Sequence, residues 1–166
     1  MFVCPECGSS AAVRGACESD GHERVQSHDA LLGLTVGSYR IARKIGEGGM
    51  GQVYRAVQPA IGSRVAIKVL SPECAAQRSL VERFFAEARA VNLIRHEHIV
   101  NVLDLAMFAD GRPYIVMEYL EGRALSSLIR EHGPAPLVNA TRVMLEVLSA
   151  LSAAHAKGIV HRDLKP

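Results

Sequence analysis

The sequence predicts an α+β fold in which an antiparallel sheet comes first and helices follow it. Apolar and polar residues alternate over several short stretches, a period typical of strands with one buried face. Asp110-Gly111 separates two of these stretches, and this dipeptide favours a tight hairpin turn. The five expected strands are Tyr39–Ile45, Gln52–Val57, Arg64–Leu70, Asn101–Phe108 and Arg112–Tyr119. Apolar residues recur at helical spacing in three further segments, which predict helices over residues 72–95, 123–132 and 136–157.

The composition is that of a globular chain with little net charge. Of its 166 residues, 49% are hydrophobic and 22% are charged, and the net charge is +2. This balance gives no reason to expect binding to nucleic acid or to an anionic membrane. The amino terminus has no basic segment followed by an apolar one, and no apolar run approaches the length of a membrane span. We therefore expect a cytoplasmic protein, with a membrane anchor after residue 166 left open.

Residues 1–24 are expected to form a small zinc knuckle. Cys4 and Cys7 form a C-x-x-C pair, and Cys17 follows after nine further residues. Thiolates at this spacing can share a zinc ion, which supplies the folding free energy that so short a segment lacks. The expected metal ligands are Cys4, Cys7, Cys17 and Asp20, with His22 as the alternative fourth ligand. Two other interpretations are a disordered leader with incidental cysteines and, less favoured in a reducing compartment, a disulfide framework.

Residues 25–37 form the expected linker, and the segment after it is rich in glycine. Gly46, Gly48 and Gly51 lie in a stretch with the pattern G-x-G-x-x-G. Glycine lacks a Cβ, so such a backbone can approach a bulky anion and direct successive N–H groups at phosphate oxygens. A dinucleotide-binding fold uses a similar pattern, but there it opens a helix. Here the β-prone segment Gln52–Val57 follows, so we expect these glycines at the turn of a hairpin.

A single lysine lies within the apolar strand Arg64–Leu70. Burying an ammonium group without a partner is costly, so Lys68 is expected to meet a phosphate or a carboxylate. Glu87 lies among the apolar residues of the following helical segment and is the expected carboxylate, with Glu82 as the second choice. The alternative is that Glu87 is an exposed residue of that helix.

Three motifs in this order resemble the catalytic domain of the protein kinases. They are the glycine-rich Gly46–Val53, the strand sequence Val65-Ala66-Ile67-Lys68 and the closing sequence His161-Arg162-Asp163-Leu164-Lys165-Pro166. The sequence Gly-Glu-Gly-Gly-Met-Gly-Gln-Val-Tyr is most similar to the bacterial serine/threonine kinases of the eukaryotic-like (Hanks) type. The resemblance covers residues 38–166 and implies an incomplete kinase domain, with a small lobe at about 38–120 and the start of a large lobe at 121–166.

This resemblance implies a binding site for ATP. The residues expected to contact the nucleotide are Ile45, Gly46, Glu47, Gly48, Gly49, Met50, Gly51, Gln52, Val53, Ala66, Lys68, Met117, Glu118 and Leu120. Ile45, Val53 and Ala66 would line the adenine pocket. Lys68 would hold the α- and β-phosphates. Met117 would be the gatekeeper residue behind adenine. Glu118 and Leu120 would be the hinge residues whose backbone groups bind adenine.

The same resemblance implies the catalytic residues Asp163, Lys165, Lys68 and Glu87. Asp163 would accept or orient the proton of a serine or threonine hydroxyl on a protein substrate, and Lys165 would neutralise the γ-phosphate during transfer. Lys68 and Glu87 would form an ion pair. The Mg²⁺ ligands of the family, an asparagine and an Asp-Phe-Gly motif, would come after Pro166. We therefore expect a fragment of a longer kinase that is inactive alone.

Two other functions remain as alternatives to the kinase. One is a non-catalytic relic that binds a nucleotide or a protein as an interaction module. The other, a zinc-ribbon adaptor for nucleic acid, is disfavoured because residues 1–24 lack a basic cluster with interleaved aromatic residues. The presence of Lys68, Glu87 and Asp163 in one chain favours the kinase.

Overall fold

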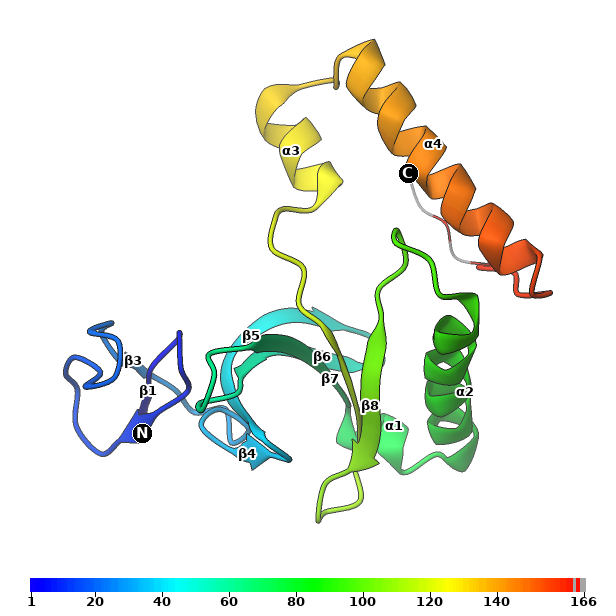
Figure 1. The fold of residues 1–166 in the computed structure, drawn as a ribbon. Coiled ribbons are helices and arrows are strands. Elements are labelled where there is room, and N and C mark those ends of the chain that lie inside the picture. Colours follow the sequence, from blue (N-terminus) through cyan, green and yellow to red (C-terminus); the bar gives the residue numbers. More distant parts are fainter. Residues whose placement is uncertain (163, 165–166) are drawn as a thin grey trace. The chain divides into compact units, whose positions relative to one another are not determined.

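The computed structural model describes residues 1–162 and Leu164. These residues form two compact units (Figure 1). The two units are Met1–Ala88 with Val102–Tyr119, and Arg89–Asn101 with Leu120–Pro166. The predicted catalytic residues Asp163 and Lys165 lie outside the described residues.

The first unit contains two antiparallel sheets. The small sheet has three strands in the order β2-β1-β3, and the large sheet has six in the order β4-β5-β6-β7-β9-β8. The strands are β1 Phe2–Val3, β2 Ser10–Ala11, β3 Val25–Gln26, β4 Thr35–Val36, β5 Tyr39–Gly48, β6 Gly51–Val57, β7 Arg64–Leu70, β8 Val102–Met107 and β9 Pro113–Glu118. The α+β class is confirmed, and the five expected strands are all present. The sixth strand, β4, corrects the expected count, because it comes from the segment expected to be a linker.

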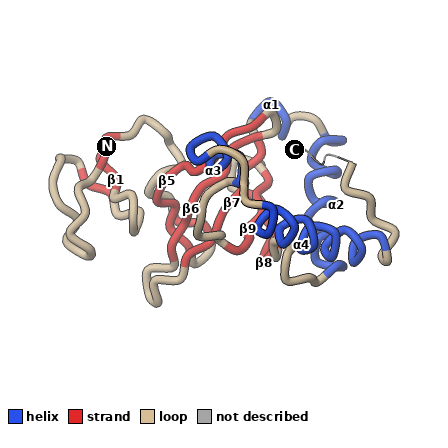
Figure 2. Tube along the Cα trace, turned by 90° about the horizontal axis from the view of Figure 1, so that it is seen from above, coloured by secondary structure: helices blue, strands red, loops and turns tan. Residues whose placement is uncertain are grey.

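Residues 1–27 form the amino-terminal ribbon. Strand β1 pairs with both β2 and β3, and the Ser27 N–H donates a hydrogen bond to Met1 O at 3.0 Å. The amino-terminal ribbon therefore extends beyond the boundary expected at residue 24. Figures 1 and 2 both show it beside β5, on the side of the large sheet away from β8.

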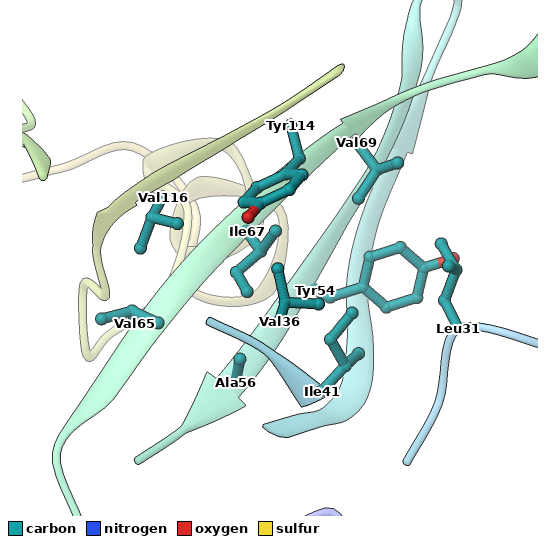
Figure 3. Packing of buried hydrophobic residues seen from close by; sticks show 10 residues of the cluster. All are labelled: Leu31, Val36, Ile41, Tyr54, Ala56, Val65, Ile67, Val69, Tyr114 and Val116. Carbon is teal, nitrogen blue, oxygen red and sulfur yellow. The ribbon is translucent and has the colours of Figure 1, made fainter. Parts of the chain in front are cut away.

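One face of the large sheet is buried under the segment that follows the amino-terminal ribbon. Leu31, only 4% exposed, and Val36 pack among the side chains of the strands (Figure 3). The buried cluster comprises Leu31, Val36, Ile41, Tyr54, Ala56, Val65, Ile67, Val69, Tyr114 and Val116. The Tyr54 hydroxyl donates a hydrogen bond to Asp29 Oδ2 at 2.8 Å. Residues 28–37 thus contribute Leu31 and Val36 to the core of the large sheet, and residues 25–26 belong to the small sheet, so the segment 25–37 is not a loose linker.

The other face of the sheet packs against a helix. The single helical segment expected over residues 72–95 is divided into α1 Pro72–Ala75 and α2 Arg78–Ile94. The Ser71 hydroxyl caps α1 by accepting a hydrogen bond from the Cys74 N–H at 3.3 Å. The buried residues of this second cluster are Leu70, Phe84, Ala88 and Ile115. Apolar spacing in the sequence therefore identified the buried side of α2.

The second unit contains the helices α3 Leu125–His132 and α4 Leu137–His155. His96 Nε2 lies 3.0 Å from Ser149 Oγ of α4. Helix α4 has 19 residues and a mean hydropathy of 1.3, so by length and composition alone it is able to cross a membrane. The core helix of a globular protein can have the same length and composition. Its exposed apolar side chains include Leu137, Met144, Leu145 and Leu148.

Candidate functional site

Strands β5 and β6 form the hairpin that carries the glycine-rich segment. Gly48 pairs with Gly51, so Gly49 and Met50 form the turn. A Cβ at Gly51 would lie 2.0 Å from Val69 O, a distance at which no side chain fits. At Gly48 and Gly49 a Cβ would meet nothing within 4 Å. Packing therefore requires glycine at position 51, whereas the turn glycines leave open space beside the hairpin.

Strand register places several of the predicted nucleotide residues on one face. Lys68 pairs with Val53, and Ala66 pairs with Arg55, across β6 and β7. Ala66 also pairs with Met117 across β7 and β9. Directly opposed residues share a face of an antiparallel sheet, and residues two apart on a strand do so as well. This face, called the nucleotide face below, therefore carries Val53, Ala66, Lys68 and Met117.

The other predicted nucleotide residues have more varied positions. Ile45 and Glu47 are exposed on β5, and Met50 packs against the cluster beneath α2. Glu118 ends β9, and Leu120 belongs to the second unit, where it is 63% exposed. The structure does not test whether the last two form a hinge, and their contact with adenine stays a prediction.

Lys68 lies beside an aromatic ring. Its Nζ is 5.6 Å from the centroid of the Phe84 ring, a distance suited to a cation–π contact, and it makes no ion pair among the described residues. Glu87 is 49% exposed and accepts a hydrogen bond from Arg83 Nε at 2.9 Å. Glu82 is likewise paired with an arginine four residues earlier. The structure thus does not bring Lys68 and Glu87 together, and their ion pair stays a prediction.

A hollow of about 240 Å³ lies beside the glycine hairpin in the first unit. Its lining includes Gly48, Gln52 and Arg112. Neither Ala66 nor Lys68 belongs to the lining, so this hollow is not the expected adenine pocket.

Four donor groups of the amino-terminal ribbon converge on one point. The thiols of Cys4, Cys7 and Cys17 and a carboxylate oxygen of Asp20 all lie within 4.8 Å of one another. The Sγ atoms of Cys7 and Cys17 are 3.4 Å apart, and Cys4 Sγ lies 3.3 Å from Asp20 Oδ2. Tetrahedral zinc with Zn–S bonds of about 2.3 Å separates its ligands by about 3.8 Å, so this donor set fits the ion. His22 is not in the set, and its Nδ1 lies 3.4 Å from Asp20 Oδ1.

The two halves of this cluster have the same backbone turn. In each half a cysteine carbonyl accepts a hydrogen bond from a glycine N–H four residues later, at 3.0 Å for Gly8 and 2.8 Å for Gly21. These glycines have φ values of +73° and +74°, in the left-handed region that favours glycine. We call Cys4–Gly8 the first knuckle and Cys17–Gly21 the second. The pattern C-x-x-C-G thus recurs as C-x-x-D-G, a signal in the sequence that identifies Asp20 as the fourth donor.

Burial and hydrogen bonding give the donor groups different affinities for protons. Burial raises the pKa of the Cys4 thiol to about 12. Burial also opposes ionisation of Cys17, but hydrogen bonds from the Ser9 hydroxyl and a backbone N–H outweigh it and lower the pKa to about 7. Burial acts against Asp20 as well, yet hydrogen bonds from the Cys7 thiol and a backbone N–H hold its pKa well below the usual range. The cluster therefore carries negative charge at neutral pH, which favours a cation.

The sequence comparison agrees with the fold. The protein kinase domain family matches residues 39–166. Because this match covers most of the chain, the chain belongs to the protein kinase family.

Several bacterial serine/threonine-protein kinases are similar to this chain. Pkn1 of Myxococcus xanthus is 49% identical over 142 residues, which cover 86% of this chain and 20% of that protein. PknK of Mycobacterium tuberculosis is 46% identical over 124 residues, which cover 74% of this chain and 11% of that protein. The chain therefore spans only a small part of the curated relatives it matches.

The fold is also that of a solved kinase domain. The crystal structure of the PknI kinase domain of Mycobacterium tuberculosis superposes with a TM-score of 0.67 at 33% identity. The superposition covers 80% of this chain and 53% of that chain.

Proposed function

We propose that the chain carries the nucleotide-binding part of an ATP-dependent protein serine/threonine kinase. The observation that carries this proposal is the shared position of Val53, Ala66 and Lys68 on the nucleotide face, next to the glycine hairpin. In this family the glycine-rich loop covers the phosphates and the strand lysine contacts them. The N–H groups of the hairpin and the ammonium group of Lys68 would stabilise the negative charge of the phosphates. Mg²⁺, which the family uses, neutralises further phosphate charge when bound.

We also propose that Glu87 exchanges its present partner for Lys68 in the active arrangement. Glu87 follows Phe84 by three residues, so it lies about 60° around the helix axis from that buried side chain. A modest rotation of α2 would turn it toward the sheet. The exposed pair with Arg83 opposes this rotation weakly, since such pairs within a helix contribute only about 0.3–0.5 kcal/mol.

The proposed reaction transfers the γ-phosphoryl group of ATP to a serine or threonine hydroxyl of a protein substrate. Asp163 would orient that hydroxyl, and Lys165 would stabilise the charge on the transferred group. We place this activity in the cytoplasm and assign no nucleic acid as a partner.

Phosphoryl transfer by the product of the full open reading frame tests this proposal. Lys68→Met and Asp163→Asn should each lower transfer to a protein substrate by at least about 100-fold, because each removes a group that acts on the reacting atoms. Arg78→Ala, at an exposed position of α2, is the control and should retain activity. Normal transfer by both site variants would refute these assignments. Nucleotide binding without any transfer by the unaltered protein would instead favour a non-catalytic relic.

A second proposal concerns zinc: Cys4, Cys7, Cys17 and Asp20 together bind one Zn²⁺ ion. The converging donor atoms and their separations support this assignment. Metal analysis of the purified chain should find one zinc per molecule, and Cys17→Ser should abolish it. Cys74→Ser is the matched control, since Cys74 is a free cysteine outside the cluster. Absence of stoichiometric zinc from the unaltered chain would refute the site.

A further inference from the structure

A buried arginine on β6 is directed at the amino-terminal ribbon. Arg55 is 3% exposed although it lies on a strand of the large sheet. Its Nη2 donates hydrogen bonds to Pro5 O and, at 3.2 Å, to Glu6 O. Its Nη1 lies 3.0 Å from Glu6 Oε2. Its Nε has no hydrogen-bond partner among the described residues. Among the described residues, the first knuckle therefore supplies the hydrogen-bond and ion-pair partners of this buried cation.

The same carboxylate also reaches the neighbouring strand. Glu6 Oε2 lies 3.7 Å from Arg64 Nη2, at the start of β7. The side chain of Glu6 is mostly buried between these two arginines. Glu6 thus links β6 and β7 through its contacts with Arg55 and Arg64, in addition to the backbone hydrogen bonds between the two strands.

A second contact brings the first knuckle against β5. A Cβ on Gly8 would lie 2.8 Å from Ile41 O and 2.9 Å from Arg40 Cγ. At Gly21, the equivalent position of the second knuckle, a Cβ would meet nothing within 4 Å. Because the two glycines share the same φ, the closeness at Gly8 reflects docking on the sheet and not the turn itself.

The docked knuckle adjoins the nucleotide face. Arg55 pairs directly with Ala66, and it lies two residues from Val53 on the same strand, so all three share that face. Displacing Arg55 would therefore move the backbone next to residues that the proposed function assigns to adenine.

We propose that the zinc-loaded amino-terminal ribbon is a regulatory element of the nucleotide site, which holds β6 and β7 in place through Arg55. This inference rests on the proposed zinc and nucleotide sites. Pro5 and Glu6 lie between the metal ligands Cys4 and Cys7. Metal binding fixes both ends of this short loop, so the carbonyl and carboxylate groups that face Arg55 become ordered. Loss of the metal releases the loop and with it the partners of Arg55. Zinc loading thereby increases nucleotide affinity.

Hydrogen exchange of the whole chain, with zinc and after removal of zinc by a chelator, tests this coupling. In the unaltered chain, zinc removal should accelerate amide exchange in residues 51–57 and 64–70 at least tenfold. A fluorescent ADP analogue should bind less tightly after the same treatment. Arg55→Leu and the milder Glu6→Gln should keep one zinc per chain, yet exchange in these strands should already be fast and insensitive to the metal. Arg14→Ala, which breaks an exposed ion pair within the amino-terminal ribbon, is the control and should behave as the unaltered chain does.

The outcomes separate this inference from the proposals on which it rests. A chain without zinc would refute the metal site and the inference together. A chain that binds zinc but whose strands exchange equally fast with and without it would refute the inference alone. Metal-sensitive exchange that persists in both Arg55→Leu and Glu6→Gln would exclude Arg55 as the connection. Loss of phosphoryl transfer in Lys68→Met bears only on the kinase assignment.

Discussion

The first and second knuckles have the same backbone turn but very different surroundings. Both close with a glycine in the left-handed region, and both present side chains to the same point. The first knuckle packs against β5 and holds Arg55 of β6, whereas Gly21 of the second knuckle has open space around its Cα. The donor at the fourth position also differs, since Cys7 in the first knuckle corresponds to Asp20 in the second.

Two knuckles with the same backbone turn can therefore have different roles in one small metal site. The second knuckle contributes donors and little else, so its contribution is to metal affinity. The first knuckle contributes donors and also attaches the amino-terminal ribbon to the large sheet. Changes in the second knuckle should therefore affect the sheet only through the bound zinc, whereas changes in the first should also affect the sheet directly.

The largest effect is expected in a comparison of two single variants, each of which removes one metal donor from one knuckle. Cys4→Ala should abolish zinc binding and unfold the amino-terminal ribbon, because a structural zinc ion contributes about 10–16 kcal/mol to such small motifs. Asp20→Ala leaves three thiolates and should retain zinc with an affinity at least about tenfold weaker. Metal titration with a chromophoric chelator measures both. Equal loss of zinc in the two variants would show that the Asp20 carboxylate contributes as much to zinc binding as the Cys4 thiolate.

The second prediction compares the two glycines directly. Gly21→Ala should lower the free energy of unfolding of the zinc-loaded chain by about 1–2 kcal/mol, the cost of a left-handed conformation for a residue with a Cβ. Gly8→Ala bears the same cost and also overpacks against Ile41 O, which adds a further cost of about 1–3 kcal/mol. Urea denaturation of the two variants measures the difference. If both are destabilised to the same extent, the first knuckle is not docked in solution.

The third prediction makes the donor sets of the knuckles alike. Asp20→Cys completes a set of four thiolates, which zinc prefers to a set with one carboxylate, so zinc should bind about tenfold more tightly, or about 1.4 kcal/mol. Replacement of zinc by cobalt should give the absorption of a four-thiolate site. Once the metal is bound, amide hydrogen exchange in β6 and β7 should be the same as in the unaltered chain. A weaker affinity would show that the second knuckle is shaped for a carboxylate.

The smallest effect at neutral pH concerns Tyr54 of β6, which binds Asp29 in the segment that follows the amino-terminal ribbon. Burial, together with the hydrogen bond to Asp29, raises the pKa of Tyr54 above its usual value of 10.0. Below pH 10 the hydroxyl is protonated in both the folded and the unfolded chain. As the pH rises above 10, the unfolded chain ionises first, so stability should fall by up to about 1.4 kcal/mol per pH unit.

Tyr54→Phe isolates this contribution. The variant keeps the buried ring and should lose only about 1 kcal/mol at pH 7, the net contribution of a hydrogen bond. Its stability should then fall less steeply between pH 10 and 11 than that of the unaltered chain. Denaturation curves at these pH values provide the measurement, and identical slopes would exclude Tyr54 as the titrating group.

Much of the candidate site was accessible from local patterns. The glycine spacing, the alternation after it and the lysine within an apolar strand together predicted the hairpin and the placement of Lys68. The cysteine spacing predicted that these side chains converge, because residues a few positions apart need only a local turn to meet, and zinc binding by them stays a prediction. In contrast, the sequence pattern placed Glu87 on the inner side of α2, and in the structure it is half exposed and paired with Arg83. Helical spacing defines a buried side only to within one neighbouring position, and Glu87 lies at its border.

The sequence by itself determined the class of fold, the family and the residues proposed to bind a metal or a phosphate, since periodicity, glycine and cysteine act over a few residues. Only the tertiary structure decided the partner of Arg55, which lies 49 residues from Glu6. It also decided that Leu31 and Val36 belong to the core of the sheet. Such contacts depend on how separate elements pack, and an arginine on a strand or a leucine in a linker carries no local mark of a distant partner.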